Sequence, residues 1–301
     1  MITKIQLRAL RTCHLKFRFA TSTINSTSSF LSSRWPQLSG ALSTKQTAAN
    51  LCFANWFSSS TASTSTINST SSFLSSRWPQ LSGALSTKQT VPADIALSVI
   101  KECFNTLGRE PYFGEPVTHE EHALQCATLA MDEGFEEDVV VAAFLHDIGH
   151  ICAPEDAPHM DTDGGPDVGV VDHEIVGKEL LAVLGFSKFV TDLVESHVPS
   201  KRYLVSTIEE YKQNLAEDSK RSLLFQGGFM TKEEVDSFNQ EPMKDMKIQF
   251  REWDEKGKQP NFVTPKIEKF YQMVERHLRR QEEERQRNGV HCTVKYQPGD
   301  Q

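Results

Sequence analysis

A histidine and an aspartate that stand side by side, His146 and Asp147, have the clearest chemical potential in this sequence. The five residues before Phe144 are apolar and uncharged, so the pair ends a segment that we expect to be buried. Ionisable groups in such a place are costly unless something neutralises them. A metal ion does so, because neutral imidazole and carboxylate are both good ligands for divalent cations. The stretch therefore predicts a metal site, and His150 places a second imidazole beside it.

Four more residues of ligand type complete the predicted site: His122, His173, His197 and Asp254. Each lies on or at the end of a different predicted helix, and helical bundles build metal sites from inward-facing side chains in this way. Six ligands are too many for a closed zinc site but enough for two metal ions that share one carboxylate. We interpret the other histidines as ordinary surface or core residues: His14, His119, His159, His277 and His291.

The elements that must position these side chains are predicted to be helices, because apolar residues recur at helical spacing from Pro92 onward. The predicted helices run from 92 to 108, 118 to 134, 136 to 149, 173 to 185, 187 to 196 and 243 to 255. The helix that starts at 187 ends at His197, and Pro199 is expected to stop it. A long final helix starts at Thr264-Pro265 and has a charged end. Without convincing β alternation, the fold class is all-α.

Two sequence features refine this arrangement. Thr118 with Glu121, and Thr231 with Glu234, are capping boxes that mark the start of a helix. Residues 151–171 are rich in Pro, Gly and Asp, which predicts a long loop, and long loops inside compact domains often form lids. The folded domain is predicted to span residues 92–289, followed by a tail over 290–301.

The first ninety residues differ in composition from the rest of the 301-residue chain. They are rich in Ser and Thr, and nine Lys or Arg but no Asp or Glu precede Asp94. Residues 21–47 recur unchanged as residues 64–90, and two copies of such a segment do not make a solenoid. A basic, Ser-rich, acid-poor leader is typical of an organelle transit peptide followed by disordered sequence. We expect a mitochondrial address before a plastid one, and a cytoplasmic location if the leader is no signal.

The remainder of the chain is acidic, which argues against nucleic acid as a partner. None of the six cysteines has CxxC spacing, so neither a zinc ribbon nor a disulfide framework is indicated. Apolar runs are too short for a membrane span. The sparse cysteines fit the reducing interior of a cell or organelle best.

The ligand set in this order resembles the HD-domain superfamily of metal-dependent phosphohydrolases and oxygenases. Further stretches narrow the resemblance: YFGE (112–115), HVPSKRYL (197–204), SKRSLLFQGG (219–228) and REWD (251–254). Together they are similar to the mixed-valent diiron HD-domain oxygenases that cleave the carbon–phosphorus bond of 1-hydroxyphosphonates. Their type is 2-amino-1-hydroxyethylphosphonate dioxygenase (glycine-forming), the PhnZ type. The resemblance covers about residues 95–260, and residues 153–170 look like an added loop.

The resemblance implies two iron ions, as a mixed-valent Fe(II)/Fe(III) pair. By this resemblance, one iron would be held by His122, His146, Asp147 and Asp254. His173 and His197 would hold the other, with Asp147 as the bridge. The reaction would consume O2 and convert the hydroxyphosphonate into a carboxylic acid and phosphate. A separate phosphonate hydroxylase would supply such a substrate.

Substrate-binding residues are predicted by position in the same stretches. The candidates to bind the phosphonate are His150, Lys201, Ser219, Ser222 and Gln226, with Lys201 the strongest because it is a point charge. The resemblance implies that Glu115 forms an ion pair with an ammonium group of the substrate. It also implies that Tyr112 occupies a vacant coordination position on an iron until the substrate arrives. Trp253 is interpreted as a core residue.

Two other classes of function remain open on the sequence alone. The first is a phosphohydrolase that uses nearly the same ligands to activate water against a phosphoester or nucleotide. The second is a scaffold without activity, which the full set of ligand residues disfavours. An oxygenase acting on an inositol ring is a further variant of the fold. The substituent on the phosphonate is not fixed by the sequence.

Overall fold

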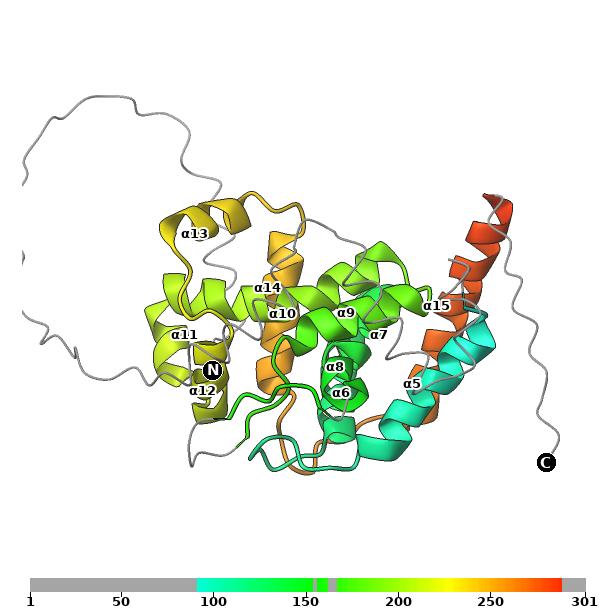
Figure 1. The fold of residues 1–301 in the computed structure, drawn as a ribbon, viewed down its shortest axis with the longest axis horizontal. Coiled ribbons are helices and arrows are strands. Elements are labelled where there is room, and N and C mark those ends of the chain that lie inside the picture. The colour runs from blue at the N-terminus through cyan, green and yellow to red at the C-terminus, as the bar shows by residue number, and fades with distance from the viewer. Residues whose placement is uncertain (1–90, 154–155, 162–166, 289–301) are drawn as a thin grey trace, which may run out of the picture. The chain divides into compact units, whose positions relative to one another are not determined.

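The computed structural model describes residues 91–153, 156–161 and 167–288 (Figure 1). The predicted leader with its duplication and the predicted tail therefore lie outside the described residues. Within these ranges every regular element is a helix, which confirms the all-α prediction, and the only β pairing is two isolated bridges. Helices are numbered as in Figure 1.

Eleven helices are described, and the longest connection between them runs from α8 to α9. They are α5 (Ala93–Leu107), α6 (His119–Asp132), α7 (Glu137–Leu145), α8 (Ile148–Cys152), α9 (His173–Val183), α10 (Lys188–Thr207), α11 (Glu209–Asn214), α12 (Glu217–Phe225), α13 (Lys232–Asn239), α14 (Lys244–Lys256) and α15 (Ile267–Arg287). None of them is both long enough and apolar enough to cross a membrane.

Helix α7 is the central element of the main apolar core. All residues from Val139 to Leu145 are buried, and α6, α10, α14 and α15 pack around the helix. Phe144 stacks between Phe104 of α5 and Phe270 of α15, with ring centroids 4.8 and 5.5 Å away. Burial on all sides explains why α7 is apolar without amphipathic periodicity. The end of α7 is thereby fixed in the interior, where the predicted ligand pair begins.

A second, smaller apolar cluster joins the end of α10 to α11, α12 and α13. Its buried members are Tyr203, Leu204, Val205, Tyr211, Leu215, Leu223 and Phe238. Leu223 anchors α12 to this cluster, while Ser219 and Ser222 lie buried on the same helix. The cluster therefore holds α12 in place beside the candidate site.

The prediction that Pro199 ends a helix is wrong. Helix α10 continues through Pro199 to Thr207. A proline inside a helix removes one backbone hydrogen bond. Here Val198, Leu204 and Val205 are buried beyond the break point, so tertiary packing outweighs that loss. As a consequence Lys201 lies one helical turn after His197, on the same face.

The single helix predicted over residues 136–149 is also wrong. Helix α7 ends at Leu145, His146 caps it, and α8 starts at Ile148. Asp147 lies between the two helices with φ −101° and ψ 13°, a sparsely populated backbone conformation that is frequent at functional sites. Gly149 lets α8 approach α9 closely, because an added Cβ would lie 1.9 Å from the carbonyl oxygen of His173.

Other local predictions have mixed outcomes. Both capping boxes are present, at Thr118 and at Thr231. The final helix starts at Ile267 after the cap residue Lys266, three residues later than the predicted Thr264-Pro265. In the described parts of the predicted loop 151–171, residues 158–161 and 167–171 pair through backbone hydrogen bonds.

Candidate metal centre and substrate pocket

The six predicted metal ligands meet in one buried cluster. They come from α6, the α7–α8 junction, α9, α10 and α14, and each is at most 9% exposed. Nε2 of His122 lies 3.1 Å from Nε2 of His146 and 3.4 Å from Oδ1 of Asp254. Nε2 of His173 lies 2.8 Å from Nε2 of His197. The structure thus brings together residues that are up to 132 positions apart in the chain.

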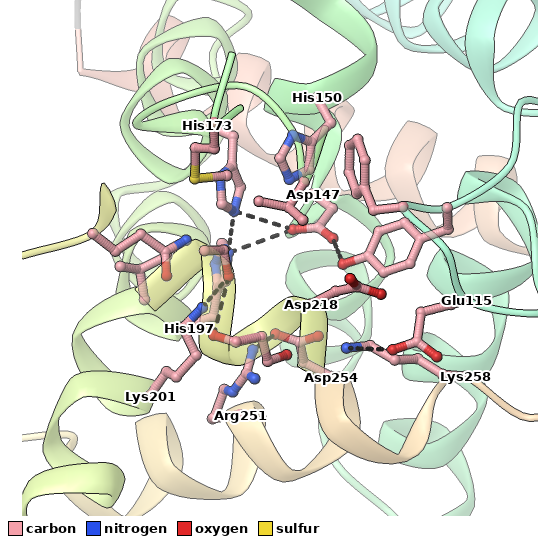
Figure 2. Close-up of a pocket in the computed structure, with 18 residues that line it drawn as sticks. Glu115, Asp147, His150, His173, His197, Lys201, Asp218, Arg251, Asp254 and Lys258 are labelled. Atoms are coloured by element: carbon pink, nitrogen blue, oxygen red, sulfur yellow. Dashed lines mark hydrogen bonds and ion pairs between the residues drawn. The ribbon is translucent and has the colours of Figure 1, made fainter. Parts of the chain in front are cut away.

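Asp147 stands between two halves of this cluster, as Figure 2 shows for the half with His173 and His197. Its Oδ1 lies 3.5 Å from Nε2 of His173 and 3.4 Å from Nε2 of His197. Its Oδ2 lies 3.5 Å from Nε2 of His122 and 3.4 Å from Nε2 of His146. One carboxylate oxygen therefore faces each pair of imidazoles, which is the arrangement of a bridging ligand.

In each of the four imidazoles, Nδ1 contacts a backbone carbonyl, and this contact determines that Nε2 faces the cluster. Nδ1 of His122 contacts the carbonyl of Gly257 at 2.9 Å, and Nδ1 of His146 contacts that of Ala143 at 2.9 Å. The other two imidazoles have the same arrangement: His173 with Val170 at 3.2 Å, and His197 with Val194 at 2.6 Å. A carbonyl only accepts, so each Nδ1 carries the proton and each Nε2 presents a lone pair to the centre.

This arrangement fits metal ions. Two Nε2 lone pairs that face each other at 2.8 Å are not a hydrogen bond unless a proton is added, and without a cation they repel. Oδ1 of Asp254 is buried and has no hydrogen-bond partner. Nitrogen and carboxylate donors suit iron and other first-row metals. The donor set therefore has the composition and the spacing for two ions.

The buried carboxylates add negative charge to the centre. Burial alone would raise the pKa of Asp147, but His146 and His122 outweigh burial and hold that pKa well below its usual range. Burial opposes ionisation of Asp254 too, and the neighbouring Arg251 guanidinium holds its pKa well below the usual value. Arg251 binds Oδ2 of Asp254 and so leaves Oδ1 turned toward the imidazoles. Both carboxylates are therefore ionised and ready for cations.

A pocket opens onto this centre, with an empty volume of ≈ 450 Å³. Its lining includes every residue that the sequence predicted for substrate binding or catalysis: Tyr112, Glu115, His150, Lys201, Ser219, Ser222 and Gln226. It also exposes Asp147, His173, His197 and Asp254 of the metal centre. The pocket thus joins the predicted metal and substrate residues into one site (Figure 2).

Tyr112 and Glu115 lie on the loop between α5 and α6. The Tyr112 hydroxyl donates a 2.6 Å hydrogen bond to Oδ2 of Asp147, and its ring stacks on His122 with centroids 4.3 Å apart. Burial, together with the Asp147 charge, raises the pKa of Tyr112 well above its usual value, so the hydroxyl stays protonated. Glu115 lies at the rim, with Oε1 3.9 Å from Nζ of Lys258.

His150 presents a defined hydrogen-bond donor. Its Nδ1 accepts the backbone N–H of Val170 at 3.1 Å, so in the neutral ring the proton sits on Nε2. Burial and the neighbouring His173 hold the pKa of His150 well below its usual value, which keeps the ring neutral. Its ring stacks on that of His173 with centroids 3.8 Å apart. His150 therefore offers a hydrogen-bond donor beside the centre and is not a further ligand.

Lys201 reaches the pocket from α10 and donates a 2.9 Å hydrogen bond to Oγ of Ser222. Burial, with Arg251 nearby, lowers the pKa of Lys201 well below its usual value. Lys201 therefore carries its predicted positive charge when an anion enters the pocket and raises the pKa of the amine again. Ser219 lies one turn before Ser222 on α12, and Oε1 of Gln226 is buried without a hydrogen-bond partner.

Several lining residues were not predicted as site residues. Arg251 was seen only as part of the REWD stretch, although its i,i+3 spacing to Asp254 was a usable signal. Met160 and Val168 come from the predicted lid loop, and Asp218 and Lys258 are charged residues at the rim. Nothing in the local sequence separates these two from ordinary surface charges. Trp253 is fully buried, as predicted for a core residue.

Comparison with known proteins places the chain in a family. The HD domain family model matches residues 120–224. The 1-hydroxy-2-(trimethylamino)ethylphosphonate dioxygenase (glycine-betaine-forming) of Leisingera caerulea is 42% identical over 173 residues, which cover 58% of this chain and 85% of the relative. Hydroxymethylphosphonate dioxygenase of Gimesia maris is 36% identical over 168 residues, covering 55% and 80%. An uncharacterized protein of Acanthamoeba polyphaga mimivirus is 35% identical over 162 residues, covering 54% and 72%. The chain therefore belongs to the HD-domain family of phosphonate dioxygenases.

Proposed function

We propose that this protein uses two iron ions and O2 to cleave the carbon–phosphorus bond of a 1-hydroxyphosphonate such as 2-amino-1-hydroxyethylphosphonate. The products are a carboxylic acid, which is glycine for this substrate, and phosphate. The reaction balances as RCH(OH)PO3²⁻ + O2 → RCOO⁻ + HPO4²⁻ + H⁺. The observation that carries the proposal is Asp147, whose two oxygens each face one pair of imidazoles beside a pocket that Lys201, Ser222 and Gln226 also line.

The two halves of the centre have different surroundings, and this supports different roles. His122, His146 and Asp254 close one half with three ligands besides Asp147. His173 and His197 supply only two ligands to the other half, and both line the pocket. A metal ion held there would keep positions open to the pocket. Iron in this place would supply the redox chemistry with O2 that zinc and magnesium lack.

The chain's own residues would orient the substrate. Lys201, Ser219, Ser222 and Gln226 all line the pocket, with Lys201 bonded to Ser222, and would offer donors for the phosphonate oxygens. The Nε2–H of His150 adds a neutral donor beside His173. Holding the phosphonate in this way would place the carbinol carbon next to the metal half with open positions. The Tyr112 hydroxyl donates to Oδ2 of Asp147, the oxygen that faces His122 and His146, and would occupy a position at the centre until the substrate arrives.

The test is a single-turnover and steady-state assay on the full-length protein loaded with Fe(II) under anaerobic conditions. On addition of O2 and 2-amino-1-hydroxyethylphosphonate, we expect equal amounts of consumed O2, phosphate and glycine. Asp147→Ala should abolish both iron binding and turnover, because it removes the bridge. The control Asp236→Ala removes an exposed aspartate on α13 and should change neither.

The same assay separates the proposal from a phosphohydrolase. A hydrolase would release phosphate from a phosphoester without O2 uptake and would accept Mn²⁺ or Mg²⁺ in place of iron. Phosphate release that is independent of O2 would contradict the proposed function. Full activity of Asp147→Ala would contradict the assignment of the metal site.

A further inference from the structure

The two ends of the pocket differ in charge. The cations Lys201 and Arg251 are buried, each 3% exposed, whereas two lining carboxylates, Glu115 and Asp218, have side chains 19% and 24% exposed and so lie nearer the rim (Figure 2). A phosphonate bound at the inner end would therefore place its substituent at the anionic end. Glu115 was already expected there, whereas Asp218 has no assigned role.

Glu115 does not face the pocket alone. Its Oε1 lies 3.9 Å from Nζ of Lys258, and the same Nζ lies 5.6 Å from the centroid of the Tyr112 ring. Lys258 is largely buried, with a side chain 11% exposed, so it neutralises part of the Glu115 charge with little screening by solvent. Glu115 is thus in part already satisfied by the protein's own cation.

Asp218 is placed differently. Its Oδ1 accepts a 3.1 Å bond from Arg221, whose side chain is 46% exposed, so solvent screens this pair. Its Oδ2 lies against Gly114 of the loop that carries Glu115: an added Cβ at Gly114 would be 2.8 Å from it. Gly114 has φ +80°, and only a residue without a side chain allows this close approach. Asp218 is therefore held beside the loop that carries Glu115.

We infer that Asp218 is a specificity-determining residue that, together with Glu115, binds a positively charged substituent of the substrate. Phe113 and Met160 line the same pocket and provide apolar surface for the alkyl groups of such a cation. A neutral substituent of the same shape would leave Asp218 with only the solvent-screened Arg221 as a partner and would bind less tightly. The inference rests on the proposed function, because the phosphonate must bind at the inner end for the substituent to reach the rim.

The test compares two ligands of nearly identical shape, 2-(trimethylammonio)ethylphosphonate and its carbon isostere 3,3-dimethylbutylphosphonate. Neither has a 1-hydroxyl group, so neither is a substrate of the proposed reaction. Their dissociation constants are measured by calorimetry on the full-length, iron-loaded protein without O2. In the unaltered protein we expect the cation to bind about 10-fold more tightly than the isostere, as one charge-assisted contact allows.

Asp218→Asn should reduce this preference to roughly 2-fold or less while leaving the isostere's dissociation constant unchanged. The matched control is Glu217→Gln, which removes the same charge one residue earlier on α12, from a side chain that is 75% exposed and pairs with Lys220. It should keep the preference. Glu115→Gln should reduce the preference by a smaller factor than Asp218→Asn, because Lys258 shares that carboxylate.

Three results would overturn the inference. A preference that Asp218→Asn leaves intact would show that Asp218 does not contact the substituent. Weaker binding of both ligands by the same factor would show that the substitution disturbs α12 and not the contact. If neither phosphonate binds to the unaltered protein, the proposed function fails and the inference fails with it, whereas phosphonate binding without a charge preference refutes the inference alone.

Discussion

Gly149 should be essential for the second metal ion, although it is not a ligand. An added Cβ would lie 1.9 Å from the carbonyl oxygen of His173 and 3.0 Å from the backbone nitrogen of Gly177. Real Cβ contacts are essentially never below 3.0 Å, so Gly149→Ala must move α8 and α9 apart by about 1.1 Å. Both obstructing atoms are backbone, so no side chain can rotate away.

The displacement acts directly on the metal centre. His173 is the first residue of α9, and Asp147 immediately precedes α8. The 3.5 Å spacing between Nε2 of His173 and Oδ1 of Asp147 would therefore be lost, whereas site geometry tolerates only about 0.5 Å. We expect Gly149→Ala to lower the free energy of unfolding by about 1–3 kcal/mol, as overpacking does. We also expect its iron content to fall from two ions toward one.

The assay is colorimetric iron determination after anaerobic loading, beside urea unfolding of the same samples. The control is Gly134→Ala, where φ is +80° but no atom lies within 4 Å of the added Cβ. Backbone strain should cost it about 1–2 kcal/mol with the full iron content retained. If Gly149→Ala binds two irons and unfolds like the unaltered protein, the close approach of α8 and α9 does not position His173.

Three further predictions concern the charges around the centre. Arg251→Met should leave Asp254 as an unpaired buried charge and lower the free energy of unfolding by roughly 3–5 kcal/mol. It should also reduce the iron bound in the half of the centre that contains His122, and Arg251→Lys should restore part of both properties. Unchanged iron content in Arg251→Met would contradict this prediction. In protein stripped of metal, burial opposes protonation of His146, but Asp147 outweighs it and raises that pKa to about 10, whereas burial lowers the pKa of His173 to about 4. Metal binding to the first half should thus release a proton at pH 7 and weaken as pH falls, which calorimetry in buffers of different ionisation enthalpy would detect; identical heats in all buffers would contradict it. Burial also lowers the pKa of His277, whose Nε2 accepts the Ser187 N–H at 3.2 Å. The unfolded chain therefore binds the proton more readily, and the free energy of unfolding should fall as pH drops below about 6.5. The free energy of unfolding of His277→Gln should depend less on pH between pH 7 and pH 5.

The clustering of the six candidate ligand residues was predictable from the sequence because each of them breaks a local rule. An imidazole on an apolar helix face, or a carboxylate at the end of a buried run, conflicts with burial unless a metal is bound. His122 and His173 both gave that signal, and the structure places both in the centre. The helices were predictable for the same reason, because their buried faces repeat with helical periodicity.

The rim was not predictable, because its residues obey local rules. Asp218 has an i,i+3 arginine partner on a polar helix, which is the pattern of an ordinary surface residue. Its place at the pocket depends on Gly114, which is 104 positions away. The prediction at Pro199 was wrong for a different reason. The local rule predicts that the helix ends there, but packing of Val198 and Leu204 outweighs that preference.

The two corrections to the predicted helices explain the site better than the predictions did. The helix predicted over residues 136–149 is interrupted between Leu145 and Ile148, and Asp147 lies in that interruption. The break turns Asp147 so that its oxygens reach imidazoles on both sides. The continuation of α10 through Pro199 then places Lys201 one turn after His197, so that one helix brings both side chains to the pocket. Both departures from simple helix rules therefore shape the candidate site.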